Sequence, residues 1–258
     1  MSLLETVHQF GHGPHKVIVV HGWMAGAALF DPLHGWLDPE RFTYAFMDCR
    51  GYGARREAPG PFTVEQIARD MLNLADLLDW SHFSVVGHSM AGMAAQWLQA
   101  HAAERLVSVV LLASVPASGA TLSPERRALL GEALHEPLAR QLLISANVGH
   151  CQDEEWLRGM LQLSLRTTWV EAMSRYLESW SGDDFAEAVK GVRVPTLVLV
   201  GERDPGCTVA SMNNTLMRWL PTARLEILPA VGHYPMREAP AELARVIETW
   251  LLARAERC

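Results

Sequence analysis

The chain has 258 residues, of which 49% are hydrophobic and 20% charged, proportions typical of a globular domain. Its net charge of −7 argues against nucleic acid as a partner, because such partners require a clustered basic face. The four cysteines form no C-x-x-C pair, so we predict neither a zinc site nor a disulfide scaffold and expect reduced thiols at Cys49, Cys151, Cys207 and Cys258.

Membrane and export signals are not apparent. The first eight residues lack a basic region followed by an apolar stretch of signal-peptide length. Apolar runs such as 17–20 and 109–113 are far too short to cross a bilayer. We therefore expect a cytoplasmic protein that acts on a small molecule and does not associate with membranes.

Short apolar runs rich in β-branched residues alternate with helical patterns along the chain. Such runs suit strands that are covered on both faces, as in a parallel sheet, and they occupy 17–20, 44–47, 83–86, 107–112, 196–200 and 225–228. Apolar residues repeat at helical spacing between them, over 64–78, 91–103, 209–220 and 241–253. This alternation predicts the α/β class, with a mostly parallel, doubly wound sheet.

One segment, 116–190, interrupts this alternation. It contains no convincing strand, and prolines such as Pro116, Pro124 and Pro137 divide it into successive helical patterns. We predict that 1–115 and 191–258 form the core domain and that 116–190 is a helical cap over one edge of the sheet.

The most specific motif is Val85-Val86-Gly87-His88-Ser89-Met90-Ala91-Gly92, which links a predicted strand to a predicted helix. A nucleophile elbow has this context, and its tight turn requires small residues two positions either side of the serine, here Gly87 and Ala91. Such a turn exposes Ser89 at the start of the helix, where the N–H of Met90 can face a developing oxyanion. We predict that Ser89 is a nucleophile and that the Met90 amide is an oxyanion donor.

A second donor is predicted in His21-Gly22-Trp23, which directly follows the run 17–20. A glycine turn after a strand can direct the next backbone N–H into the site, so the Trp23 amide is the candidate. The Trp23 indole can also line the pocket. The His21 side chain is expected only to pack within the loop.

A serine hydroxyl requires a general base. Beyond Ser89, His101 falls in the following helix, and His135 and His150 fall in the insertion. His233 instead follows the last predicted strand, at the edge of the sheet that also carries Ser89. We predict His233 as the base.

The base requires a carboxylate that orients it, and two candidates follow the run 196–200. Asp204 stands three residues beyond Gly201, whereas Glu202 follows that glycine immediately and has less loop to reach the imidazole. We therefore predict Asp204, with Glu202 as its competitor. The chain order Ser89, Asp204, His233 is typical of α/β-hydrolases rather than of serine proteases.

These motifs together make the chain resemble the α/β-hydrolase superfamily, over its whole length. The combination of H-G-W with G-x-S-M is most similar to the aryl esterases and cofactor-free haloperoxidases, although Ala91 stands where the family usually has glycine. The resemblance implies a lid formed by 116–190 and a structural role for Asp48-Cys49-Arg50-Gly51-Tyr52-Gly53. It implies no metal or organic cofactor.

The cap carries regularly spaced aromatic and methionine side chains. Trp169, Met173, Tyr176 and Trp180 follow at steps of four, three and four residues, and Trp156 belongs to a second apolar stripe. Such stripes can pack the cap onto the core, or they can line a pocket for an apolar group. These five residues are the candidates for binding substrate, although we expect most of them to pack the cap onto the core and only some to line the pocket. The net charge of the cap, −4, favours a neutral substrate over a polyanion.

The predicted activity is hydrolysis of a carboxylic ester of a small, largely apolar substrate through an acyl-enzyme. A C–C bond hydrolase or a lactonase could use the same triad, and a non-catalytic ligand-binding protein could retain the fold. Dehalogenases and epoxide hydrolases are disfavoured, because they need a carboxylate where Ser89 stands.

Overall fold

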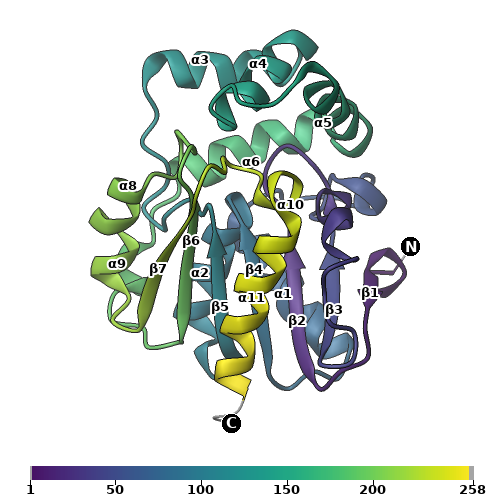
Figure 1. Cartoon of the computed structure of the whole chain (residues 1–258), viewed down its shortest axis with the longest axis vertical. Coiled ribbons are helices and arrows are strands. Elements are labelled where there is room, and N and C mark those ends of the chain that lie inside the picture. Colours follow the sequence, from purple (N-terminus) through teal and green to yellow (C-terminus); the bar gives the residue numbers. More distant parts are fainter. Residues whose placement is uncertain (1, 256–258) are drawn as a thin grey trace.

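The computed structural model describes residues 2–255, and the sheet within this part has seven strands in the order β1-β3-β2-β4-β5-β6-β7 (Figure 1). All neighbouring strands are parallel except β1 and β3. The fold class predicted from the sequence is confirmed. The strands are β1 His8–Phe10, β2 His15–Val20, β3 Phe42–Met47, β4 Phe83–His88, β5 Leu106–Leu112, β6 Thr196–Gly201 and β7 Ala223–Leu228.

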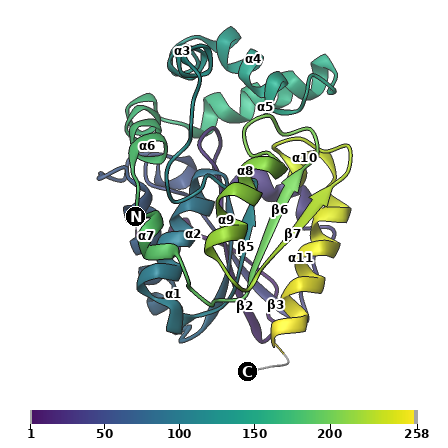
Figure 2. The same ribbon diagram turned by 90° about the vertical axis from the view of Figure 1, so that its left-hand side faces the viewer.

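Helices cover both faces of the sheet. Figure 2 shows α1 (Val64–Leu77) and α2 (Met90–His101) on one face and α11 (Pro240–Ala255) on the other. The predicted helix over 209–220 is two shorter ones, α8 (Val209–Asn214) and α9 (Leu216–Trp219), and α10 (Pro235–Glu238) precedes α11. Short 3-10 turns are η1 (Leu4–Thr6), η2 (Ala27–Leu33), η3 (Gly53–Arg55) and η4 (Ala103–Arg105). No helix in the described part of the chain is long and apolar enough to cross a membrane.

Helix α1 illustrates how the sequence specifies an element. Thr63 caps its start by accepting a hydrogen bond from the backbone N–H of Gln66. Its buried face contains Ile67, Met71 and Leu74, which recur at helical spacing. Burial of this face against the sheet, rather than intrinsic propensity, accounts for most of the helix's stability.

Five helices lie between β5 and β6: α3 (Pro124–Glu132), α4 (Pro137–Asn147), α5 (Glu154–Thr167), α6 (Val170–Gly182) and α7 (Ala186–Val189). Helices α3 to α6 lie beyond the carboxyl ends of the strands, at the top of Figure 1. We call these four the cap helices. Helix α7 instead contacts α2, beside the sheet (Figure 2).

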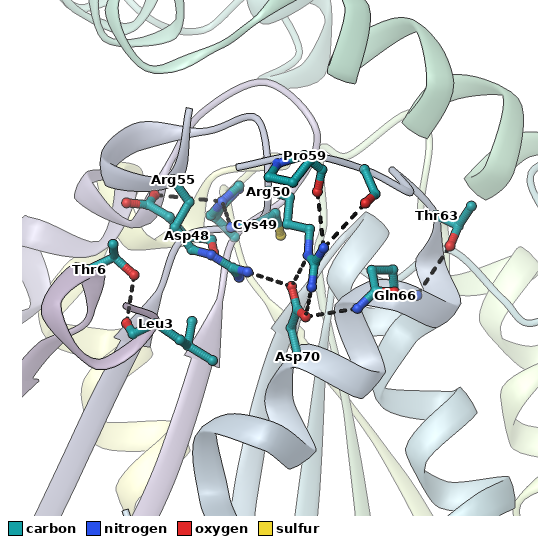
Figure 3. Close-up of polar contacts among 12 residues, drawn as sticks. Leu3, Thr6, Asp48, Cys49, Arg50, Arg55, Pro59, Thr63, Gln66 and Asp70 are labelled. Atoms are coloured by element: carbon teal, nitrogen blue, oxygen red, sulfur yellow. Dashed lines mark hydrogen bonds and ion pairs between the residues drawn. The ribbon is translucent and has the colours of Figure 1, made fainter. Parts of the chain in front are cut away.

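The loop after β3 connects the core to the cap. Asp70 of α1 forms ion pairs with Arg50 (2.9 Å) and Arg55 (2.7 Å) and accepts a hydrogen bond from Gln66 (2.8 Å; Figure 3). Gly51 has φ +81°, and a Cβ there would lie 2.1 Å from the Ala172 Cβ of α6. Glycine thus permits the close approach of this loop to the cap, in agreement with the structural role expected for 48–53.

Candidate active site

The turn between β4 and α2 presents Ser89. Its backbone has φ +55° and its N–H donates to the Leu112 carbonyl at 2.9 Å, which fixes the turn against β5. A Cβ at Gly87 would lie 2.5 Å from the Ala91 carbonyl oxygen, so only glycine fits there. The Ala91 methyl is fully buried and accommodated. Ser89 therefore occupies a strained backbone conformation that the surrounding packing maintains.

Three side chains from separate loops form one hydrogen-bonded row. The Ser89 hydroxyl lies 3.1 Å from Nε2 of His233, and Nδ1 of His233 lies 2.6 Å from an Asp204 carboxylate oxygen. Ser89 follows β4, Asp204 follows β6 and His233 follows β7, so the parallel sheet brings all three to one edge. Glu202, the competitor for the acid position, is exposed and instead accepts from the Ala230 N–H at 2.7 Å.

Asp204 is held as a buried anion. Burial alone would raise its pKa, but the opposing effects of His233 and of the Cys207 and Gly206 N–H groups are larger and lower it overall. Those N–H groups lie 3.1 and 2.8 Å from the second carboxylate oxygen. A carboxylate that remains ionised can fix the imidazole tautomer and stabilise an imidazolium beside it.

The cap encloses this row in a cavity of about 520 Å³. The sequence led us to expect an exposed Ser89, and this expectation is wrong: the residue is only 8% exposed, and residues of the cap segment complete the cavity around it. Apolar side chains such as Leu29, Leu130 and Leu143 form much of the wall. A space of this size and lining suits a small, partly apolar ligand.

The two amides predicted as oxyanion donors flank Ser89. Met90 is the first residue of α2, and Trp23 lies in the loop after β2 and lines the cavity. Within residues 2–255, neither amide N–H forms a hydrogen bond to another loop or to a side chain. The Trp23 indole donates to the Met173 carbonyl of α6 at 2.7 Å.

His21 packs within the loop, as expected. It is fully buried; Nδ1 donates to the Gly22 carbonyl at 2.7 Å, and Nε2 accepts from the Cys49 N–H at 2.9 Å. Burial lowers its pKa, although nearby Asp48 opposes this effect. A neutral imidazole that forms two hydrogen bonds here stabilises the turn that carries Trp23.

His88 was not singled out from the sequence. Its Nε2 donates to the His233 carbonyl at 2.9 Å, and its Nδ1 accepts from the Gly22 N–H at 3.2 Å. Complete burial and the neighbouring His233 lower its pKa to about 3. The available signal was a polar residue at the end of an otherwise apolar strand, immediately before the serine.

Of the five candidates for binding substrate, only Trp180 lines the cavity. Met173 and Tyr176 are fully buried, Trp156 is partly buried with its ring near Tyr234, and Trp169 is 36% exposed and packs edge-on against Phe62. These four pack the cap onto its surroundings, which corrects their selection as substrate-binding candidates. Helical spacing identifies a buried face but not the surface that this face contacts.

Potential metal ligands coincide with the hydrogen-bonded row. Ligand atoms of Asp204, Cys207 and His233 lie within 4.8 Å of one another. However, the Cys207 thiol donates to the Ala113 carbonyl at 3.0 Å, and burial raises its pKa well above the usual range, so it is a poor thiolate ligand. Cys49, Cys151 and Cys207 are free thiols, and Cys258 lies outside the described residues.

The family model described as "Alpha/beta hydrolase family" matches residues 17–246, which include the turn at Ser89, the loops after β6 and β7, and the whole cap. The chain belongs to the alpha/beta hydrolase family. It is therefore a hydrolase of this fold, with the strand order and cap insertion described above.

The curated relatives of the hydrolase have low sequence identity to it, but their alignments cover most of both chains. It is 27% identical over 203 residues to the "3-oxoadipate enol-lactonase 2" of Acinetobacter baylyi, covering 78% of this chain and 75% of that protein. It is 26% identical over 246 residues to the "Pimeloyl-[acyl-carrier protein] methyl ester esterase" of Nitrosomonas europaea, covering 90% of this chain and 93% of that one.

Among solved structures, a thermophilic esterase from Thermogutta terrifontis superposes on the hydrolase with a TM-score of 0.82 at 22% identity. The match covers 96% of this chain and 93% of that one. This likeness shows a shared fold.

Proposed function

We propose that the hydrolase cleaves a carboxylic ester of a small, largely apolar substrate through an acyl-enzyme. The observation that carries this proposal is the row Ser89–His233–Asp204, with hydrogen bonds of 3.1 and 2.6 Å, inside a cavity beneath the cap. A nucleophile, its base and an orienting carboxylate in this order are the parts that acyl transfer requires.

The proposed reaction has two steps. His233 Nε2 takes the proton of the Ser89 hydroxyl as its oxygen attacks the ester carbonyl, and the resulting imidazolium returns the proton to the departing alcohol. A water molecule activated by His233 then attacks the acyl-enzyme and releases the acid. The Trp23 and Met90 amides, which have no competing loop acceptor within the described residues, are the proposed donors to the tetrahedral oxyanion.

The names of the relatives support ester chemistry. One is a lactonase and one a methyl ester esterase, and a lactone is a cyclic ester that the same attack opens. A lactone therefore remains the second candidate substrate class.

The decisive experiment compares wild type with Ser89→Ala on a panel of 4-nitrophenyl esters and simple lactones. Loss of the nucleophile of such a triad reduces kcat by about 10⁶-fold. We also expect a fluorophosphonate probe to label wild type but not the variant. A variant that keeps a tenth of the wild-type esterase activity, with its fold intact by circular dichroism, would contradict the proposal.

A further inference from the structure

One charged side chain lines the same cavity as Ser89 without belonging to the proposed triad. Arg126 lies in the first turn of α3 and is partly buried at the wall of the cavity. Its Nη2 donates to the side-chain carbonyl of Asn147, which lines the cavity too. The cap thus places a guanidinium inside the space proposed for the substrate.

This guanidinium has no anionic partner among residues 2–255. The Asn147 oxygen is neutral, and no other acceptor within the described residues bonds the donors on Nε or Nη1 of Arg126. Elsewhere, the buried Arg55 pairs with Asp70 and the half-buried Arg105 pairs with Asp76. Arg140 and Arg237 are also sheltered without a carboxylate, but backbone carbonyls or hydroxyls accept from their Nε and from at least one Nη. Arg126 differs from them because, within the described residues, Asn147 alone accepts from its guanidinium.

Nearby charges do not compensate for this burial. Desolvation lowers the Arg126 pKa, and the attraction of the Asp204 carboxylate only partly opposes the effect. Asp204 already accepts hydrogen bonds from His233, Gly206 and Cys207. A partly desolvated arginine with free donors favours an incoming anion, because a carboxylate matches its planar fork and restores the lost solvation.

We propose that the substrate carries a carboxylate remote from the ester, and that Arg126 binds it. This inference rests on the proposed ester hydrolysis and narrows its substrate class to half-esters of dicarboxylic acids and to lactones with a carboxylate substituent. The apolar wall formed by Leu130 and Leu143 then contacts the carbon chain between the two polar ends.

The proposal revises the neutral substrate expected from the acidic cap. The net charge of a segment describes its average field, whereas recognition depends on the charges that face the cavity. The cap contributes Arg126 to the lining and no acidic residue, and Asp204 comes from the core.

The test uses two 4-nitrophenyl esters that differ only at the far end of a short acyl chain, which carries either a carboxylate or a primary amide. The quantity measured is the ratio of kcat/KM for the anionic ester to kcat/KM for the amide. We expect wild type to favour the anionic ester and Arg126→Gln to lower the ratio about 10- to 100-fold, the usual effect of losing a charged hydrogen bond. Arg126→Lys should recover part of it.

Arg127→Gln is the matched control, because Arg127 is exposed and does not line the cavity. Its ratio should equal that of wild type. A purely structural role for Arg126, through Asn147, would slow both esters equally and leave the ratio unchanged. An unchanged ratio, or a wild type that favours the amide, overturns the proposal.

A binding measurement separates this inference from the proposed function. Glutarate and its monoamide are titrated calorimetrically into Ser89→Ala and into Ser89→Ala with Arg126→Gln. Tighter binding of glutarate that depends on Arg126 supports the anion site even if wild type hydrolyses neither ester. Equal binding of the two compounds, together with active ester hydrolysis, rejects the anion site and leaves the proposed function standing.

Discussion

The His88 imidazole donates from Nε2 to the backbone carbonyl of His233 at 2.9 Å, while its Nδ1 accepts from the Gly22 N–H at 3.2 Å. One buried side chain therefore joins the loop of the proposed base to the loop of a proposed oxyanion donor. Both loops flank Ser89, the next residue in the chain. His88 is thus a positioning residue for the proposed reaction.

His88→Gln should lower kcat by roughly 10- to 100-fold, because small displacements of reacting groups have effects of this size. KM should remain within a few-fold, since glutamine leaves a polar side chain of similar size at this point of the cavity wall. Steady-state kinetics with an activated ester measure both constants. A KM increase with unchanged kcat would show that His88 shapes the binding space rather than the base.

Stability should depend on pH through the same residue. The His88 pKa is about 3 in the folded chain, against 6.5 as its ordinary value, so below pH 6.5 the unfolded chain binds a proton that the folded chain does not. The free energy of unfolding should therefore fall as the pH drops from 6.5 toward 3, by up to about 1.4 kcal/mol per pH unit from this group. The free energy of unfolding, measured with urea at several pH values, should depend less steeply on pH in His88→Gln than in wild type.

Asp204→Asn and Glu202→Gln should differ sharply. The amide cannot hold the imidazole tautomer, so Asp204→Asn should reduce kcat by about 10⁴-fold. Glu202→Gln should behave like wild type, because Glu202 is exposed and, in the described part of the chain, its carboxylate accepts a hydrogen bond from the Ala230 N–H and none from His233. Kinetics of an activated ester on both variants measure this. The reverse order would transfer the orienting role to Glu202.

Trp180→Ala should shift substrate preference toward longer acyl chains, because it removes an aromatic wall of the cavity. Trp169→Ala is the control: Trp169 packs against Phe62 outside the cavity, so its chain-length profile should match wild type. A series of 4-nitrophenyl esters of increasing length measures both. A shift in the Trp169 variant alone would falsify this assignment of the cavity wall.

The sheet and the candidate site were predictable to different degrees. Buried parallel strands carry continuous apolar runs, so β2 to β6 and the loops holding Ser89 and Asp204 could be predicted. The run 225–228 was also predicted as a strand, but the expectation that it is buried is wrong: β7 lies at the edge of the sheet, and Glu226 and Ile227 are exposed. Strand β1, with the sequence His-Gln-Phe, is short and has no such run. The break between α8 and α9 at Thr215, with φ −124° and ψ −93°, likewise leaves no periodic signal.

Side-chain roles in the cap depend on tertiary packing. Trp169 and Trp180 share a sequence stripe, yet Trp169 precedes α6 and only Trp180 reaches the cavity. Arg126 and Arg127 are neighbouring arginines that the sequence does not distinguish. The orientation of α3 decides that Arg126, and not Arg127, lines the cavity. His88 is recognisable only once the loops carrying Gly22 and His233 are placed beside it.

The bond from the Trp23 indole to the Met173 carbonyl ties α6 to the loop after β2, and the Thr167 hydroxyl of α5 accepts from the Gly26 N–H of the same loop at 3.2 Å. The Trp23 carbonyl also accepts from the Tyr52 hydroxyl at 2.5 Å, so the loop that carries the proposed oxyanion donor is bonded to α6 on one side and to the core on the other. Substitutions of cavity-lining residues in α3 can therefore diversify substrate preference over evolution, whereas those that displace α6, or α4 whose Asn147 carbonyl accepts from the His233 N–H at 2.9 Å, would alter the rate of every substrate alike.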